Sequence, residues 1–359
     1  MEEFGDYKKK PNDYPREYLK TIKDKFNYEE FSKKLDYSKN LKALIIGDSI
    51  IDQYVFVSPK GRAVKDPILS AQFKEEESYA GGTLAIANHL SSYINRIKLV
   101  TLIGDQNSKL DFINNSLSKN SELEYFIKEN SPTTIKRRYI DGYRNNKLFK
   151  VEYINDQPIS EKLSKEIVDY LSGELPKQDI VIVSDFGHGF INNSIRKVLE
   201  EKSSFLSANI QSNSSNLGYN YINHYKNLDF IVMNEDELRL PLMMRFEDIN
   251  ETMFKFYEKF KFEKFLVTMG KGGCLFFNKG EIYGGPALIK KVVDTVGSGD
   301  AVFSIVSPFA YLNVDNEMVP FIANCAGAIK SEYMGNKEKV SKDKLIKFIK
   351  EIYDGMERI

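Results

Sequence analysis

The stretch DTVGSGD, residues 294–300, is followed directly by an apolar run of helical character, residues 301–312. Gly297 and Gly299 have no side chain that would keep a ligand away from the backbone amides. The helix that follows presents unpaired N–H groups and the positive end of its dipole at the same place. The segment Gly297, Ser298 and Gly299 is therefore predicted to be an anion site suited to a phosphoryl group in transfer.

Asp300 stands in the first turn of that helix, where a carboxylate would repel a phosphate. Its presence there therefore indicates a chemical role. A carboxylate with an ordinary pKa of about 4 is ionised at neutral pH and can accept a proton from a hydroxyl group. Asp300 is therefore the candidate catalytic base. The alternative is that Ser298 and Asp300 merely cap a helix after a glycine turn.

Working outward from this segment, short apolar runs alternate with helix-like stretches, and polar residues follow the ends of the runs. This pattern predicts an α/β fold, a three-layer α/β/α sandwich with a mostly parallel central sheet. Ligands bind such sheets beyond the carboxyl ends of the strands. The predicted strands are Leu41–Ile46, Ile97–Ile103, Ile180–Val183, Phe230–Met233 and Phe265–Thr268.

Two stretches, residues 54–79 and 133–153, alternate polar and apolar residues instead. The second contains Asp141-Gly142 and Asn145-Asn146, which are hairpin-turn signals. We expect the two stretches to form a small antiparallel β lid. Because exposed sheet edges tend to pair, a homodimer through the lid is also predicted.

Residues 1–40 are rich in charged residues and are interpreted as a polar, solvated N-terminal arm with one or two helices, such as Tyr28 to Leu35, before a single domain at 41–359. Lys plus Arg equals Asp plus Glu at 51 each, which gives no reason to expect nucleic acid or a membrane as a partner. The two cysteines, Cys274 and Cys325, fit a reducing cytoplasm. No signal peptide or membrane span is expected, and the predicted location is cytoplasmic.

The segment DTVGSGD resembles the signature of the ribokinase-like, or PfkB, carbohydrate kinases. Four further motifs resemble that family in the same order along residues 41–350. They are Gly47-Asp48 with Asp52, Ala80-Gly81-Gly82, Asn234-Glu235-Asp236-Glu237 and Val267–Gly273. The segment Asn324-Cys325-Ala326-Gly327 also resembles a helix of that family. The resemblance is strongest to the kinase half of bifunctional heptose-phosphate kinase/nucleotidyltransferases, on GDSIIDQY, PTTIKRRYI and SDFGHG.

The resemblance implies phosphorylation of a sugar or sugar phosphate, with a heptose phosphate as one candidate, by ATP and Mg²⁺. Glu237, with Asn234, would hold hydrated Mg²⁺, and Asp294 and Thr295 would bind a monovalent cation such as K⁺. The other nucleotide contacts implied are Thr268, Gly270, Lys271, Gly273 and Asn324. Sugar contacts are expected from Asp48, Asp52, Gly81 and Gly82.

Three substrate contacts are inferred from the residues themselves. Lys136 and Arg138 share one face of a predicted strand and are candidates to clamp a phosphate on the substrate, whereas Arg137 takes the other face. Asp185 ends a strand beside glycines. Each also has a plain interpretation, as a solvated strand face or as turn chemistry.

The chain departs from the family at the position of the usual sugar-contacting asparagine, which is Ala85, so Asn88 one turn later takes its place in the prediction. The sequence therefore does not identify the sugar. The alternatives are a nucleoside kinase of the same fold and a non-catalytic sugar- or nucleotide-binding protein. No His-x-Gly-His signature of a nucleotidyltransferase is present, and a link to such a module in a longer polypeptide is a further hypothesis.

Overall fold

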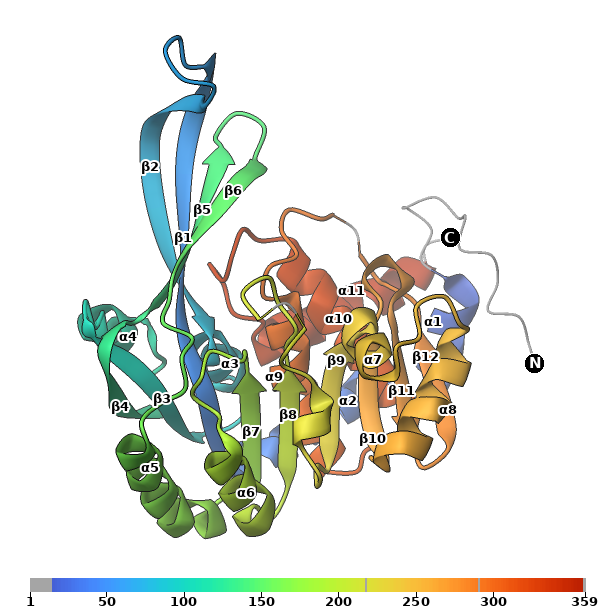
Figure 1. The fold of residues 1–359 in the computed structure, drawn as a ribbon. Coiled ribbons are helices and arrows are strands. Elements are labelled where there is room, and N and C mark those ends of the chain that lie inside the picture. Colours follow the sequence, from blue (N-terminus) through green and yellow to red (C-terminus); the bar gives the residue numbers. More distant parts are fainter. Residues whose placement is uncertain (1–14, 217, 290, 358–359) are drawn as a thin grey trace.

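The computed structural model describes residues 15–216, 218–289 and 291–357, which form a three-layer α/β/α sandwich with a sheet that projects from it (Figure 1). The strand order of the central sheet is β12-β11-β10-β9-β8-β7-β1-β3-β4, and pairing is parallel from β10 to β4. At one edge, the β10–β11 and β11–β12 pairs are antiparallel, so that β11 runs against the other strands of this order. The predicted fold class is confirmed.

The strands are β1 (Lys42–Arg62), β2 (Leu69–Gly82), β3 (Arg96–Gln106), β4 (Ser121–Pro132), β5 (Thr134–Asp141), β6 (Asn146–Tyr153), β7 (Ile180–Asp185), β8 (Leu206–Ile210), β9 (Phe230–Asn234), β10 (Lys264–Thr268), β11 (Cys274–Asn278) and β12 (Glu281–Gly285). The helices are α1 (Arg16–Lys25), α2 (Tyr28–Tyr37), α3 (Thr83–Leu90), α4 (Leu110–Ser116), α5 (Glu161–Glu174), α6 (Asn193–Lys202), α7 (Glu235–Arg239), α8 (Ile249–Phe260), α9 (Ser298–Tyr311), α10 (Met318–Ser331) and α11 (Lys342–Glu357). The five predicted apolar runs correspond to β1, β3, β7, β9 and β10.

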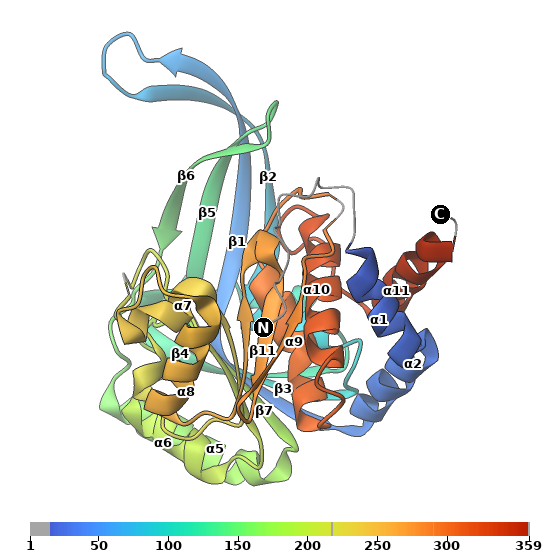
Figure 2. The ribbon, with the colours of Figure 1, turned by 90° about the vertical axis from the view of Figure 1, so that its right-hand side faces the viewer.

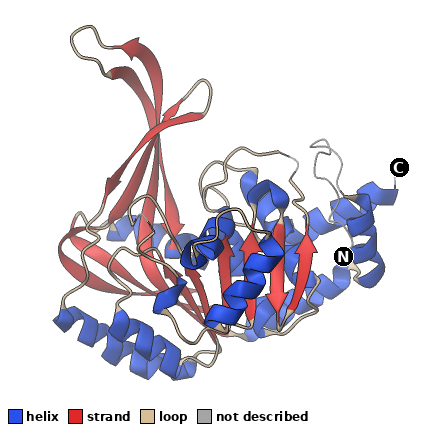
Figure 3. Ribbon diagram, turned by 45° about the vertical axis from the view of Figure 1, so that its right-hand side comes forward, coloured by secondary structure: helices blue, strands red, loops and turns tan. Residues whose placement is uncertain are grey.

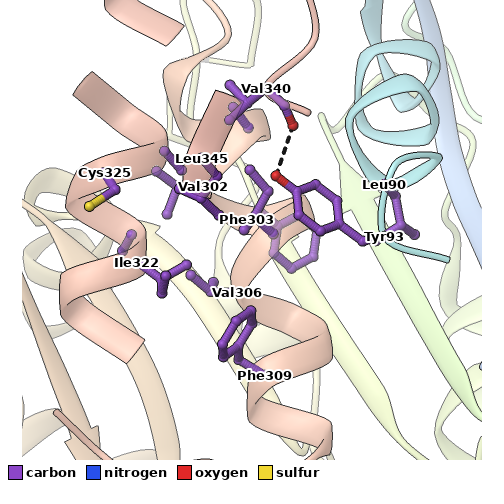
Figure 4. Packing of buried hydrophobic residues seen from close by; sticks show 14 of the residues in the cluster. Leu90, Tyr93, Val302, Phe303, Val306, Phe309, Ile322, Cys325, Val340 and Leu345 are labelled. Carbon is purple, nitrogen blue, oxygen red and sulfur yellow. Dashed lines mark hydrogen bonds between the residues drawn. The ribbon is translucent and has the colours of Figure 1, made fainter. Parts of the chain in front are cut away.

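Two hydrophobic clusters hold the layers together, one on each face of the central sheet. Helices α5, α6, α7 and α8 contribute to the first cluster, and the remaining helices contribute to the second (Figure 2). In the second, apolar residues of α9 and α10, such as Phe303 and Ile322, pack together, and the Tyr93 hydroxyl donates to the carbonyl of Val340 at 2.9 Å (Figure 4). This packing fixes α9, the helix that begins at the glycine segment.

Strand β1 continues from the central sheet into the projecting sheet, which consists of residues 49–62 of β1 with β2, β5 and β6 (Figure 3). The two stretches predicted to form a lid therefore pair with each other. The expectation of a wholly antiparallel lid is wrong at one seam, because β1 pairs with β5 in parallel. The β1–β2 and β5–β6 pairs are antiparallel as expected.

The N-terminal helices are part of the folded core, which corrects the expectation of a solvated arm for residues 16–37. Leu19, Ile22, Phe31 and Leu35 are each at most 1% exposed. The Phe31 ring lies 5.2 Å from that of Phe321 in α10. The apolar residues recur at helical spacing, so each short helix buries one stripe although its composition is polar. Residues 1–14 of the predicted arm lie outside the described residues.

Within the described residues, no helix has the length and apolar character needed to cross a lipid bilayer.

The packing of α2 yields a prediction for stability. Phe31→Ala should lower the free energy of unfolding by about 3–4 kcal/mol, because it leaves a cavity in a packed core. Urea denaturation followed by circular dichroism measures this change. Tyr37→Ala, on the same helix but 63% exposed, is the control and should change the free energy by less than about 0.5 kcal/mol. Similar small effects for both variants would show that α2 does not pack as described.

Candidate active site

The glycine segment forms the N-terminus of α9, and no side chain caps it within the described structure. Gly297 is the N-cap residue with φ of 81°, a left-handed conformation that favours glycine. A side chain at Gly299 would point into open space, and the Ser298 hydroxyl is buried without a partner in the described structure. Uncapped amides and an unpaired hydroxyl at the start of a 14-residue helix can accept an anion. The alternative of a simple side-chain helix cap does not fit this geometry.

Asp300 lies at the same place, in the first turn of α9, and is 8% exposed. Its Oδ1 accepts a hydrogen bond from the Gln211 amide at 3.2 Å. Burial, with the negative charge of Asp52 as the next cause, raises the pKa of Asp300 to about 7. A carboxyl group with a pKa near neutrality is suited to exchange a proton with a substrate hydroxyl.

A cavity of about 320 Å³ joins the glycine segment to both sheets. Many of the predicted site residues line it together, although they come from distant parts of the sequence. The central sheet and its loops contribute Asn234, Glu237, Thr268, Gly297, Gly299 and Asp300, and the projecting sheet contributes Asp52, Gly82, Lys136 and Arg138.

Strand alternation divides the basic residues of β5 between two faces, as the sequence predicts. Lys136 and Arg138 line the cavity, whereas Arg137 donates to Gln53 at 2.9 Å and lies over the Tyr153 ring on the other face. Arg138 forms an ion pair with Asp52. Lys136 is 7% exposed, and its burial lowers the pKa of its ammonium group. The cavity wall on this side is therefore basic and shielded from water.

Asn234 and Glu237 form a capping box at the start of α7. The Glu237 amide donates to Asn234 Oδ1, and the Asn234 amide donates to Glu237 Oε2, both at 2.9 Å. Glu237 Oε1 accepts the Ser212 amide, and burial raises the pKa of Glu237 to about 7. The described residues contain no cluster of three His, Cys, Asp or Glu side chains for a metal ion. Mg²⁺ bound to phosphates keeps much of its water and needs few carboxylates, so Glu237 and Asn234 fit a hydrated ion.

The two glycines at the end of β2 allow close approach to β1. A Cβ at Gly81 would lie 2.3 Å from Asp52 Oδ2, and one at Gly82, where φ is 56°, would lie 2.5 Å from the Asp48 carbonyl. Gly82 lines the cavity, whereas Gly81 lies against the Asp52 carboxylate. Asp48 lines a separate, smaller hollow, where its Oδ2 has no hydrogen-bond partner in the described structure. Burial, reinforced by Asp185, raises the pKa of Asp48 to about 7.

The remaining predicted substrate contacts lie away from the main cavity because other partners hold them. The Asp185 carboxylate accepts hydrogen bonds from Tyr225, Asn220 and the Gly187 amide. The Asn88 amide donates to the Ser116 carbonyl at 2.9 Å and lines a hollow behind α3 instead of facing a sugar.

The predicted nucleotide contacts are likewise divided. Thr268 lines the cavity, but Gly270 and the exposed Lys271 form a short turn after β10 that does not. Gly273 is required for packing, because a Cβ there would lie 2.1 Å from the Gly285 carbonyl. The buried Asn324 amide donates to the carbonyls of Gly285 and Pro320, at 2.8 and 2.9 Å, and acts within the core.

Asp294 and Thr295 do not fit the predicted monovalent-cation site. Asp294 Oδ1 accepts from Lys147 Nζ at 2.5 Å and from the Val296 amide at 3.1 Å, and Oδ2 accepts from the Tyr54 hydroxyl at 2.8 Å and the Gly335 amide at 2.9 Å. Four donors occupy this carboxylate. The Thr295 carbonyl accepts the Ser298 amide at 3.1 Å.

The cavity also contains residues that the sequence did not single out. Gln211, the hydrogen-bond partner of Asp300, follows β8 at the carboxyl edge of the sheet, and Asn209 lines the cavity beside it. The position after a parallel strand was the available signal. His188, in the loop after β7, is 3% exposed, and its Nδ1 lies 3.8 Å from Asp48 Oδ2, with neither ring nitrogen hydrogen-bonded in the described structure.

Comparison with protein-family models matches residues 40–335 to the pfkB family carbohydrate kinases. Among curated proteins, Bifunctional protein HldE of Helicobacter pylori strain J99 is 24% identical over 299 residues, which covers 82% of this chain and 64% of that protein. The protein of the same name from Desulfatibacillum aliphaticivorans is 24% identical over 295 residues, 80% of this chain and 59% of that one. The chain thus spans less than two thirds of the length of these relatives.

Solved structures resemble the fold along most of the chain. Ribokinase of Arabidopsis thaliana, complexed with ribose and ATP, matches with a TM-score of 0.65 and 18% identity over 87% of this chain and 99% of that one. Phosphofructokinase-2 of Escherichia coli, in complex with potassium, matches with a TM-score of 0.69 and 12% identity over the same shares. At these identities the structures support the ribokinase-like fold alone. The family match, which covers most of the sequence, shows that the chain belongs to the pfkB family of carbohydrate kinases.

Proposed function

We propose that this kinase phosphorylates a hydroxyl group of a sugar phosphate, with Asp300 as the general base and ATP as the donor. The observation that carries the proposal is the position of the Asp300 carboxylate, which lines one cavity with the uncapped start of α9 and with the basic face of β5. A proton acceptor, an anion site and a wall of cations thus face the same space. Phosphoryl transfer requires mainly such positioning and charge neutralisation.

The residues have distinct roles in this mechanism. Asp300 accepts the proton of the attacking hydroxyl, and a pKa of about 7 makes it a stronger base than an exposed aspartate. The amides at Gly297, Gly299 and Asp300, together with the Ser298 hydroxyl, donate to the negative charge that develops on the phosphoryl oxygens. Bound ATP supplies the phosphoryl group, and hydrated Mg²⁺ neutralises its charge. Glu237 and Asn234 would hold the water shell of that ion.

The basic wall supports a substrate that already carries a phosphate, and a heptose phosphate is one candidate of this class. Lys136 is buried beside the cavity with its nearest carboxylate, Glu152, 3.9 Å away, and Lys150 also lines the cavity. A buried cation such as Lys136 is stabilised by an anionic ligand. Asp52 and Gly82, on the same wall, are positioned to contact sugar hydroxyls.

Three further expectations stay predictions. The projecting sheet exposes the apolar side chains of Phe73 on β2 and of Phe149, Val151 and Tyr153 on β6, which supports the predicted homodimer. The link to a nucleotidyltransferase module in a longer polypeptide is supported only by the greater length of the HldE relatives. A cytoplasmic location is likewise unchanged as a prediction.

Replacing the proposed base gives a direct test. Asp300→Asn should lower kcat by about 10²–10⁴-fold with little change in KM, because the amide keeps the shape but accepts no proton. The measurement is ATP turnover with a panel of hexose and heptose phosphates. Asp111→Asn, an exposed substitution on α4, is the control. Equal turnover by wild type and Asp300→Asn would remove Asp300 as the base.

The raised pKa of Asp300 predicts the pH profile. The base works only when deprotonated, so kcat/KM should rise with pH and reach half its limiting value at the pKa of about 7. Asp52→Asn should shift this midpoint to lower pH, because it removes a negative charge that raises the pKa of Asp300. Initial rates between pH 5 and 9 at saturating ATP provide the profile. A flat profile across this range would contradict the assignment.

The basic wall predicts selectivity for phosphorylated sugars. Lys136→Met should raise KM for a sugar phosphate by about ten- to a hundredfold, the effect of losing a charged hydrogen bond of about 1.5–3 kcal/mol. KM for the same sugar without its phosphate should not change. Arg137→Met is the matched control, since Arg137 is the next residue but faces away from the cavity. An equal rise in KM for both sugars would contradict the phosphate contact.

A further inference from the structure

Asp294, at the beginning of the glycine segment, is a junction between four segments of the chain. It is buried, and its carboxylate accepts hydrogen bonds from Tyr54 in β1, Lys147 in β6, Val296 in the glycine segment and Gly335 after α10. Two of these donors belong to the projecting sheet and two to the central domain. The same carboxylate therefore fastens the projecting sheet to the anion site.

Lys147 supplies the only cationic side chain among these four donors. Its ammonium group comes from the hairpin of β5 and β6, is 40% exposed, and reaches a carboxylate that is 1% exposed. An uncompensated carboxylate at such depth would be costly, so the ion pair matters more than one at the surface. The Lys147 ammonium lies at Asp294, where the sequence predicts an external monovalent cation.

The packing around Asp294 leaves little freedom for either partner. Gly335 has φ of 50°, and a Cβ there would lie 2.7 Å from the ring of Tyr79 and 3.1 Å from that of Tyr54. These two rings lie 5.4 Å apart, edge to face, and the Tyr54 side chain is fully buried. The root of the projecting sheet is thus packed directly against the segment after α10.

That segment in turn supports the glycine segment. The amides of Val293 and Asp294 donate to the Ser331 carbonyl at 2.7 and 3.2 Å. A Cβ at Gly297 would lie 2.2 Å from Asn336 Oδ1, so the Asn336 side chain lies directly against Gly297. A displacement of the projecting sheet that breaks the contacts at Asp294 would therefore be transmitted to the amides of the anion site.

A second cation lies nearby in the interior. Lys330 in α10 is fully buried, and its ammonium has no hydrogen-bond partner in the described structure. Its positive charge acts on both Asp294 and Asp300. Lys147 and Lys330 thus both provide positive charge to the glycine segment.

We propose that Lys147, Tyr54 and Asp294 form a latch that couples the position of the projecting sheet to the anion site, with Lys147 as a built-in cation in place of a bound monovalent ion. Lys147 and Asp294 are positioning residues in this scheme, since neither lines the cavity. The inference rests on the proposed kinase function for its effect on turnover. The latch itself is a property of the protein without ligands.

Hydrogen–deuterium exchange of peptides covering residues 133–153 and 294–300 tests the latch without any substrate. Wild type should exchange at the same rate in KCl and in tetramethylammonium chloride, at an ionic strength of about 0.1 M. In tetramethylammonium chloride, these peptides of Lys147→Met should exchange at least about fivefold faster than those of wild type, which is the lower end of typical coupling between two sites. KCl should restore the protection of the variant. Tyr54→Phe should also exchange faster but without rescue by K⁺. Lys60→Met, on the exposed end of β1, should match wild type.

ATP turnover of the same variants should follow exchange, with a K⁺-dependent defect only in Lys147→Met. Wild type whose protection or turnover rises several-fold with K⁺ would overturn the built-in cation. Lys147→Met that exchanges like wild type, or is loosened equally in both salts, would also overturn it. If wild type turns over no sugar phosphate while exchange behaves as predicted, the latch stands and the proposed function fails.

Discussion

One continuous strand sets the position of both walls of the site. β1 pairs with β3 and β7 in the central sheet and then, without a break, with β2 and β5 in the projecting sheet. Side chains alternate along it, so Asp52 faces the cavity and Tyr54 reaches Asp294. A shift of one residue in this register would turn both side chains to the outer face. The close approach that Gly81 and Gly82 allow opposes such a shift.

Features that depend on local chemistry or strand period could be predicted from the sequence. These features include the glycine segment and the parallel strands. They also include the placement of Lys136 and Arg138 on one face of β5 and of Arg137 on the other. The parallel seam between β1 and β5 could not be predicted, because alternation is the same for either strand direction. The buried stripes of α1 and α2 had a signal at helical spacing, but the charge of that region concealed it.

A match to a sequence motif does not determine which groups a side chain contacts in the folded protein. Asn324, Asp185 and Asn88 match expected positions in the sequence, yet core contacts occupy their side chains. Asp294 receives donors from segments that are up to 240 residues away in the sequence. A single sequence does not show which distant segments lie together in the fold. Whether the partner of Asp294 is a lysine or an external cation depends on that pairing. In the proposed latch, Lys147 takes the place of the external ion expected at Asp294.

The charges around the cavity explain why Asp300, and not its neighbour Asp52, is suited to be the base. Both carboxylates lie beside the same cavity, and the charge of Asp52 raises the pKa of Asp300. Asp52 is held in an ion pair with Arg138, whereas the hydrogen-bond donor to Asp300 is the neutral amide of Gln211. The Arg138 guanidinium thus orients the Asp52 carboxylate. In the proposed mechanism, the two acids of one cavity therefore have different roles, Asp52 to orient and Asp300 to accept the proton.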